Sequence, residues 1–193
     1  MIDKIFVPAL KPSQLIAKIL ARLMKTVIDK IFVQHFHHSI VSGTVFGKNF
    51  WVFGVALGND EVLFEKFHGI GVKKIVEGKV PAASEILEYL GGERKVFSVV
   101  PKPLWGTPFE RRVWCELRSV KFGETITYSQ LAWRCGSPRA ARAVANAMAK
   151  NPIPIIIPCH RVVRADGGFG GFSAGIRLKK YLLDMEKSAY IEH

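Results

Sequence analysis

Residues 151–163 read Asn151-Pro152-Ile153-Pro154-Ile155-Ile156-Ile157-Pro158-Cys159-His160-Arg161-Val162-Val163. The isoleucines lie between prolines, a pattern that predicts a short, buried, extended segment. Such a segment would hold the turn Pro158-Cys159-His160-Arg161 in a fixed place. A thiol beside an imidazole is a candidate nucleophile, because the thiolate is the reactive form and a nearby base or positive charge favours it. The residues alone leave a buried structural cysteine as the alternative.

The residues before this segment follow helical patterns. Thr107 followed by Pro108 predicts the start of one helix, and Thr127 predicts the start of a second. Pro138 is expected to open a third helix over residues 139–150. Its inward-facing residues would be Ala140, Val144, Ala147 and Met148. Two short helices joined by a glycine-containing turn at 135–137 form a helix-turn-helix pattern, which is typical of DNA-binding proteins.

The residues after the segment predict a loop and a final helix. Residues 166–173 are rich in glycine and are expected to form a mobile loop. Apolar residues then recur at helical spacing from about Ile176 to Lys187, with Glu186 near the end.

The first hundred residues have a different pattern. The hexapeptide Ile2–Val7 recurs letter for letter as Ile28–Val33, and the residues between the copies predict an amphipathic helix. We expect this helix to pack on its own domain rather than on a membrane surface. Residues 40–67 predict a small antiparallel meander, residues 82–90 a helix and residues 96–100 one more strand. Three histidines favour a solvated loop over a metal site, and they are His35, His37 and His38.

The composition limits the class of protein. The chain has 193 residues, 49% of them hydrophobic, a formal net charge of +12 and three cysteines. These values exclude a disordered chain and a disulfide scaffold, and no apolar run is long enough to span a membrane. We therefore expect a soluble, cytoplasmic protein. Residues 109–165 hold 10 Lys/Arg and 3 Asp/Glu, which favours a polyanionic partner.

Prolines and a glycine at 101–107 mark the best linker. The predicted organisation has four parts: an N-terminal extension of unknown role (1–38), an N-terminal α/β domain (39–100), the linker (101–107) and a C-terminal domain (108–193).

From about Gly106 to Glu186 the chain resembles the 6-O-alkylguanine-DNA alkyltransferases, also called methylated-DNA–protein-cysteine methyltransferases. The matching motifs are Pro158–Val162, Thr127–Leu131, Pro138–Val144 and Asn151-Pro152. The resemblance implies an α/β fold. Its N-terminal domain would be RNase H-like with a small antiparallel sheet, and its C-terminal domain a mostly helical winged helix-turn-helix.

The resemblance also implies a reaction. The alkyl group on O6 of guanine would pass irreversibly and stoichiometrically to Cys159, in a single turnover and without a metal or other cofactor. His160 would act as a base through a water, and Glu186 would orient its imidazole. By favouring the imidazolium, this carboxylate would also lower the pKa of the thiol. Asn151 would hydrogen-bond the active-site turn, and Tyr128 would face the base. Without the resemblance, Glu186 would be interpreted as a surface carboxylate, Asn151 as a helix C-cap and Tyr128 as a core tyrosine.

The implied partner is double-stranded DNA bearing 6-O-alkylguanine, bound through the minor groove by a monomer that flips the base out. Arg142 would enter the base stack as a finger. The other residues implied to contact DNA are Arg139, Tyr128, Ala140 and Arg161. Those implied to contact the base are Met148, Val162, Phe172 and Ser173. Phe172 departs from the family, which often has a tyrosine there, so a hydroxyl toward the leaving oxygen is missing.

Three other classes compete with this interpretation. A non-enzymatic relative that only flags alkylated DNA would lack the cysteine, whereas Cys159 is present. A winged-helix transcription factor would explain the charge but not the motif at 158–161. A cysteine hydrolase would need an oxyanion-hole signal, and none is evident in the sequence.

Overall fold

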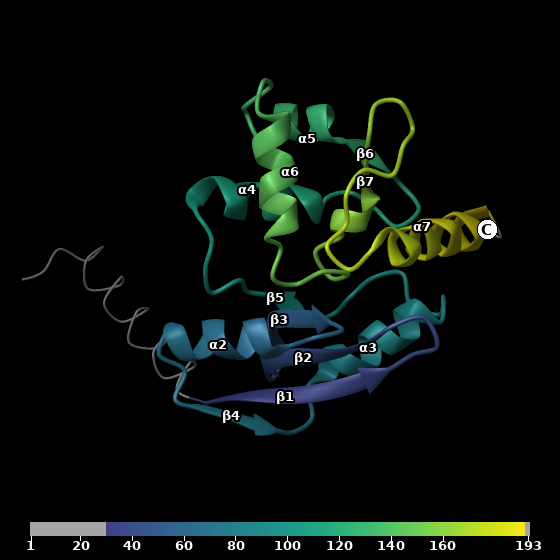
Figure 1. The fold of residues 1–193 in the computed structure, drawn as a ribbon. Helices are drawn as coiled ribbons and strands as arrows, with labels where there is room; N and C mark the ends of the chain where they lie inside the picture. Colours follow the sequence, from purple (N-terminus) through teal and green to yellow (C-terminus); the bar gives the residue numbers. More distant parts are fainter. Residues whose placement is uncertain (1–29, 192–193) are drawn as a thin grey trace, which may run out of the picture.

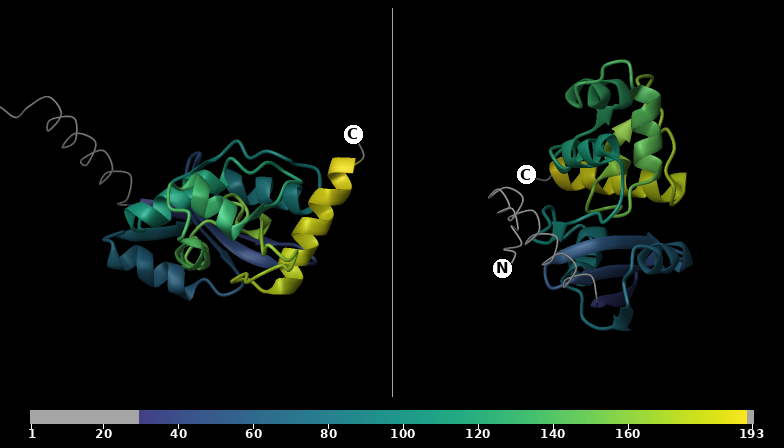
Figure 2. Two further views of the ribbon diagram at one scale, coloured as in Figure 1. Left: turned by 90° about the horizontal axis from the view of Figure 1, so that it is seen from above. Right: turned by 90° about the vertical axis from the view of Figure 1, so that its left-hand side faces the viewer.

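The computed structural model describes residues 30–191, which form a mixed α/β fold. The first copy of the hexapeptide repeat and the predicted amphipathic helix lie outside these residues. Residues 30–101 form a sheet-containing half and residues 108–191 a helical half, and the two halves are stacked on each other (Figures 1 and 2). Among the described residues, no helix is both long and apolar enough to cross a membrane.

The sheet-containing half is a five-stranded sheet in the order β4-β1-β2-β3-β5. Its strands are β1 (Lys30–His37), β2 (Ser42–Lys48), β3 (Trp51–Leu57), β4 (Lys74–Glu77) and β5 (Val100–Pro101). The three central strands are antiparallel neighbours, whereas β4 and β5 pair in parallel with β1 and β3. The sheet places α3 (Pro81–Leu90) against β1 and β2, on the side that also faces the helical half.

Successive side chains along each strand point to opposite faces of the sheet, so the sheet separates two hydrophobic clusters. Phe46 and Phe53 face α2 (Glu61–Gly69), while Val45 and Val52 face α3 and the helical half. The second group belongs to a cluster that continues through both halves, so the two halves share one core.

Several predictions for this half need correction. Antiparallel strands are confirmed for β2 and β3, but residues 61–67 belong to helix α2, because Leu63 and Phe67 are buried at helical spacing. The predicted strand at 96–100 is wrong except at its last residue. A loop is wrong for His35 and His37, which lie in β1 and bond across to β2. The predicted helix at 82–90 is confirmed as α3.

The helical half begins as predicted. Thr107 caps α4 (Pro108–Leu117) and Thr127 caps α5 (Tyr128–Arg134), each in a reciprocal capping box with the residue three positions on. The third helix, α6 (Ala141–Ala149), begins later than predicted, because residues 138 and 139 form a turn. Ala140 is therefore its half-buried N-cap. The last helix is α7 (Ile176–Ile191), and β6 (Ile126–Thr127) pairs in parallel with β7 (Val162–Val163).

The proline-isoleucine segment is buried as predicted, but it is not extended. Pro154 bridges to Ile157 across a turn, and Ile155 has a φ of 73°. Asn151 closes this turn, since its Oδ1 accepts from the Ile153 N–H and its Nδ2 donates to the Ile157 carbonyl. The segment also joins the halves, because Val55 in β3 donates its N–H to the Pro152 carbonyl at 2.8 Å. The turn that presents Cys159 is thus fixed from both sides.

Candidate active site

Cys159 begins a single 3-10 turn, Cys159–Arg161, that leads into β7. The thiol is 3% exposed and lies on the wall of a cavity of about 310 Å³. The other lining residues come from α5, α6 and the glycine-rich loop: Tyr128, Ala145, Met148, Ala149, Gly171, Phe172 and Ser173. Nδ2 of Asn151 lies 3.2 Å from Sγ and donates to it. The cavity therefore gives one buried thiol a small, mostly apolar chamber.

His160 is fully buried beside this thiol in the sequence, and its two ring nitrogens differ. Nε2 lies 3.0 Å from Oε1 of Glu186 and 3.0 Å from the hydroxyl of Tyr89. Since an ionised carboxylate can only accept, Nε2 carries the hydrogen. Nδ1 is buried and has no hydrogen-bond partner among the described residues. Nδ1 is therefore the atom that can take up a proton.

Glu186 is 1% exposed and is the most heavily bonded carboxylate of the site. Arg161 donates to it through Nε and Nη2, and the Gly123 N–H donates at 3.0 Å. Burial by itself would raise the pKa of Glu186, but the hydrogen bonds and charges of His160 and Arg161 outweigh burial and lower it to about 2. Glu186 is thus ionised, with the permanently charged guanidinium as its counter-ion.

The resting thiol and imidazole are both neutral. Burial raises the pKa of Cys159 above its ordinary value, although Asn151 and Lys179 act in the opposite direction. Burial likewise lowers the pKa of His160 and outweighs Glu186. The predicted imidazolium and lowered thiol pKa are therefore wrong for the resting protein. The physical reason is desolvation, together with an arginine that already neutralises the carboxylate.

Two residues of the site were missed from the sequence. Lys179 is fully buried, and its Nζ donates to the carbonyls of Val162 (2.6 Å), Phe169 and Gly171 (3.4 Å). Burial lowers its pKa to about 8. Helical spacing held a usable signal, because Lys179, Leu182 and Glu186 share one face of α7. The second missed residue is Tyr89, which the sequence marks only as a core residue of α3.

The predicted base-contacting residues divide into two groups. Met148, Phe172 and Ser173 lie on the cavity wall with Tyr128, whose pKa is raised by burial. Val162 does not line the cavity. It is fully buried, and its carbonyl already accepts from the lysine of α7.

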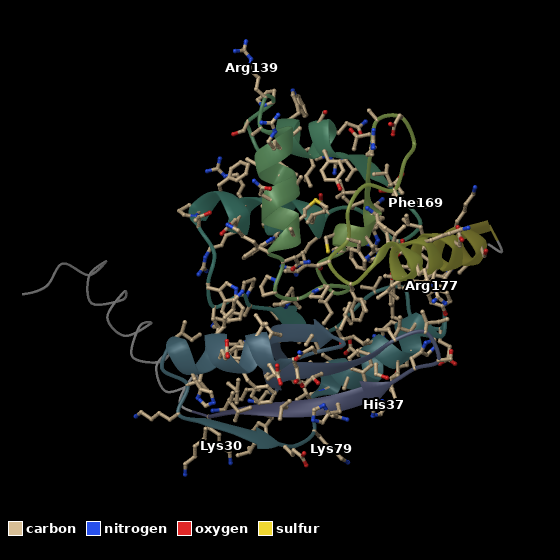
Figure 3. All side chains as sticks on the ribbon, viewed as in Figure 1. Lys30, His37, Lys79, Arg139, Phe169 and Arg177 are labelled. Atoms are coloured by element: carbon tan, nitrogen blue, oxygen red, sulfur yellow. The ribbon has the colours of Figure 1, made fainter. Side chains whose placement is uncertain are left out.

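The predicted DNA-contacting residues also divide. Arg142 is exposed on α6, one turn before the cavity-lining Ala145. Arg139 is exposed in the turn before α6 and projects away from the body at the end opposite the sheet (Figure 3). A DNA contact is wrong for Arg161, whose side chain is 8% exposed and bonded to Glu186 and to the Val120 carbonyl. Because it lies on a buried turn, Arg161 instead holds Glu186 in place.

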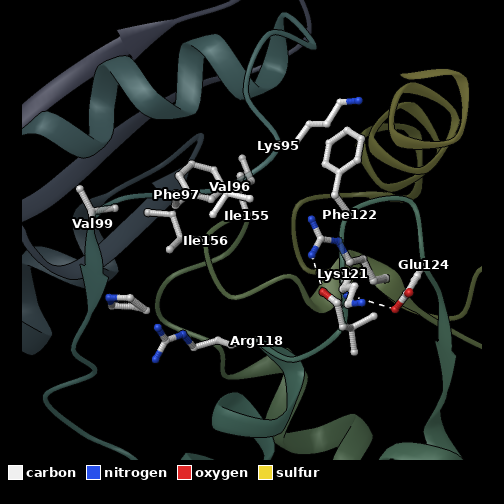
Figure 4. Close-up of a pocket in the computed structure, with 13 residues that line it drawn as sticks. Lys95, Val96, Phe97, Val99, Arg118, Lys121, Phe122, Glu124, Ile155 and Ile156 are labelled. Atoms are coloured by element: carbon white, nitrogen blue, oxygen red, sulfur yellow. Dashed lines mark hydrogen bonds between the residues drawn. The ribbon is translucent and has the colours of Figure 1, made fainter. Parts of the chain in front are cut away.

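A larger cavity of about 850 Å³ lies where the two halves meet. Phe97, Ile155 and Ile156 lie on one side of it, and Lys121 and Phe122 lie on the other (Figure 4). Its wall includes no cysteine or histidine, so the candidate chemistry belongs to the smaller cavity. Among residues 30–191, no group of three or more His, Cys, Asp or Glu side chains is arranged to hold a metal ion.

Comparisons with known proteins identify relatives of this chain. A family model described as "6-O-methylguanine DNA methyltransferase, DNA binding domain" matches residues 108–188. The methylated-DNA–protein-cysteine methyltransferase of Methanosarcina acetivorans is 43% identical over 107 residues, which cover 55% of this chain and 68% of that protein. The protein of the same name from Haemophilus influenzae is 44% identical over 104 residues, which cover 54% of this chain and 58% of the relative.

The solved structures extend the likeness to both halves. The crystal structure of the Mycobacterium tuberculosis O6-methylguanine methyltransferase is 31% identical, with a TM-score of 0.71, and the match covers 82% of this chain and 94% of that chain. A further structure from the same organism, described as in complex with DNA, has a TM-score of 0.70 at 30% identity with the same coverage.

Proposed function

The chain belongs to the methylated-DNA–protein-cysteine methyltransferase family, and from this premise we propose that it repairs DNA by moving an alkyl group from O6 of guanine to Cys159. The observation that carries the proposal is the position of the thiol. Sγ lies on the wall of a small cavity, with a neutral imidazole held by a buried carboxylate next to it in the chain. That arrangement provides a nucleophile, a general base that can take its proton, and a chamber that can hold a nucleobase.

The proposed step is a displacement at the alkyl carbon. The Cys159 sulfur forms a bond to that carbon while the carbon–O6 bond breaks and its electron pair moves into guanine. The thiol proton passes to Nδ1 of His160, directly or through a water. The released guanine anion takes up a proton from water and the imidazolium gives its proton back to water, so the net change is one proton moved from sulfur to guanine. Because both resting groups are neutral, sulfur becomes a thiolate as the proton leaves. The product is a thioether, which water does not cleave, so each molecule acts once.

The remaining cavity residues would bind the flipped base. Asn151 would hold Sγ in line, since it already donates to the sulfur and to the turn. The hydroxyl of Tyr128 would face the base, and Met148 and Phe172 would pack on it. The Ser173 backbone N–H would donate to O6. With phenylalanine at 172, no side-chain hydroxyl from that position reaches the leaving oxygen.

We propose that the helical half binds the duplex as a winged helix-turn-helix, through the minor groove and as a monomer. The sheet-containing half would be the RNase H-like domain, with residues 101–107 as the linker. The extension expected over residues 1–38 would be limited to the residues before β1, because β1 pairs with β2 and β4 inside the sheet. Arg142 would fill the gap left by the flipped base, and Arg139 and Ala140 would lie along the backbone. The exposed arginines at the start of α6 and the basic excess over 109–165 support this placement.

Mass spectrometry after mixing with duplex DNA containing O6-methylguanine tests the function. The expected result is one added methyl group on the peptide that holds Cys159. The Cys159→Ala variant should bind the same duplex but gain no methyl group. A methyl group on Cys115 or Cys135, or continued demethylation by the alanine variant, would contradict the proposal.

A further inference from the structure

We propose that Tyr89, on α3 of the sheet-containing half, is a positioning residue for alkyl transfer. Its hydroxyl holds Glu186 and His160 in the arrangement that leaves Nδ1 of His160 free to accept the thiol proton. This inference rests on the proposed function. It assigns the sheet-containing half a direct part in the chemistry of the helical half.

The ionised carboxylate of Glu186 determines which groups around Tyr89 donate hydrogen bonds. Its hydroxyl donates to Oε1 of Glu186, which can only accept. The hydroxyl oxygen lies 3.0 Å from Nε2 of His160, so that N–H is directed at two acceptors, the carboxylate and the tyrosine oxygen. Burial and the nearby carboxylate raise the pKa of Tyr89 well above 10, which keeps the donor hydrogen in place. The hydroxyl therefore fixes the tautomer of the imidazole as well as its orientation.

Packing fixes the position of the hydroxyl. The Tyr89 ring is fully buried, with the ring centroids of Phe97 at 5.3 Å and Phe122 at 6.0 Å. Both phenylalanines also form the wall of the larger cavity at the junction of the halves (Figure 4). The Arg161 guanidinium that binds Glu186 lies 5.9 Å from the ring centre of Phe122. The tyrosine, the arginine and the carboxylate thus form one packed unit behind His160.

The hydroxyl is not the sole link between α3 and α7. Tyr181 on α7 donates to the carbonyl of Leu90, the residue after Tyr89, at 2.7 Å. This second bond joins the same two helices and contacts neither His160 nor Glu186. It provides a matched control, because Tyr181→Phe removes a hydroxyl from the same junction and leaves the contacts between Tyr89, His160 and Glu186 in place.

The experiment compares wild type, Tyr89→Phe and Tyr181→Phe in single-turnover methyl transfer from duplex DNA across a range of pH. We expect Tyr89→Phe to slow transfer about tenfold, the size of one charge-assisted hydrogen bond. We expect Tyr181→Phe to stay within about twofold of wild type. Urea denaturation should show a larger loss of stability for Tyr89→Phe, because its buried hydroxyl contacts Glu186 and His160, whereas the half-buried Tyr181 hydroxyl makes one bond to a carbonyl.

The pH profile separates positioning from packing. The titratable and charged groups around the His160 imidazole are Tyr89, Glu186, Arg161 and Lys179. Without the tyrosine donor, Glu186 accepts more strongly from the imidazole and favours its protonated form. This effect outweighs the loss of the tyrosine oxygen as an acceptor, because an ionised acceptor forms the stronger hydrogen bond. The acidic limb of the Tyr89→Phe profile should therefore move to higher pH, while that of the Tyr181→Phe variant should not move.

A second variant keeps the test valid if Tyr89→Phe does not fold. Replacing Tyr89 with 3-fluorotyrosine retains the hydroxyl and makes it a stronger donor, so the acidic limb should move to lower pH. Equal rates and profiles for Tyr89→Phe and Tyr181→Phe, or an unmoved limb with the fluorinated residue, would overturn the inference. Failure of wild type to gain a methyl group would instead overturn the proposed function.

Discussion

Replacing Glu186 with glutamine tests the buried ion pair that supports the proposed base. The substitution preserves shape and one carbonyl acceptor, but it removes the charge that Arg161, His160, Tyr89 and the Gly123 N–H all contact. The guanidinium would then lie in the core without a counter-ion, because its side chain is 8% exposed. Uncompensated burial of a charge is the main cost of the substitution.

Two routes give the expected magnitude. Breaking a buried ion pair by removing one partner typically costs about 3–5 kcal/mol. Independently, lowering the pKa of Glu186 from 4.5 to about 2 corresponds to roughly 3 kcal/mol of folded-state stabilisation at neutral pH. The two agree, so Glu186→Gln should lower the free energy of unfolding by about 3–5 kcal/mol. For a chain of this length, that loss lowers the Tm by roughly 6–20 °C.

The sign of the pH dependence follows from the lowered pKa. The contribution of Glu186 is fully present above its unfolded-state value near 4.5 and is lost as the pH falls through about 2. Urea denaturation at pH 7 and at steps down to pH 3 measures it. Wild type should lose stability over this acidic range, and Glu186→Gln should lack that part of the loss. Asp184→Asn, an exposed carboxylate on the same helix, is the control and should stay within about 0.5 kcal/mol of wild type.

The reasoning fails if Glu186→Gln unfolds within about 1 kcal/mol of wild type and keeps the same acid dependence. That result would mean that Arg161 finds water or another partner when the carboxylate is gone. The slower methyl transfer that we also expect from this variant would then need another explanation.

Three further predictions concern the rim and the loop of the cavity. Arg142→Ala should slow repair of duplex DNA more than reaction with the free O6-alkylguanine base, and equal losses in the two assays would argue against a finger. Lys179→Met should cost about 2 kcal/mol or more in urea denaturation and speed thermolysin cleavage of the 164–171 loop, since buried carbonyls lose their donor. A Cβ at Gly170 would lie 2.6 Å from the Tyr128 hydroxyl at a φ of 66°, so Gly170→Ala should slow single-turnover transfer about tenfold, whereas Gly69→Ala on α2, with open space around it and no part in the cavity wall, should not.

Local patterns explain what could be predicted. Thr107 and Thr127 were identifiable as helix starts because a capping box depends on residues within one turn. The burial of the isoleucines before Cys159 was readable for a similar reason. The turn at Ile155 was not, because its positive φ is imposed by the surrounding core and is rare for a β-branched residue.

Long-range contacts explain what was missed. Tyr89 looks like any core aromatic on α3, and its bond to Glu186 joins residues 97 positions apart. The DNA contact expected of Arg161 came from the family resemblance, and the local sequence gives no sign that this arginine is buried. Its burial becomes evident only once α7 brings a carboxylate against it. Helix α2 was misread as strand because short runs of aromatic and β-branched residues fit both patterns.

The separation in sequence between the thiol and its supporting groups sets an order of events during synthesis. Tyr89 leaves the ribosome first, Cys159 follows, and Glu186 appears 26 residues after His160. Until α7 docks, the imidazole lacks the carboxylate of Glu186, and Cys159 lies on an incomplete domain. A protein whose nucleophile can be used once benefits from this delay, because the thiol becomes competent only in a molecule that has already built its cavity. The order of the chain thus delays assembly of the complete site until the last helix has been made.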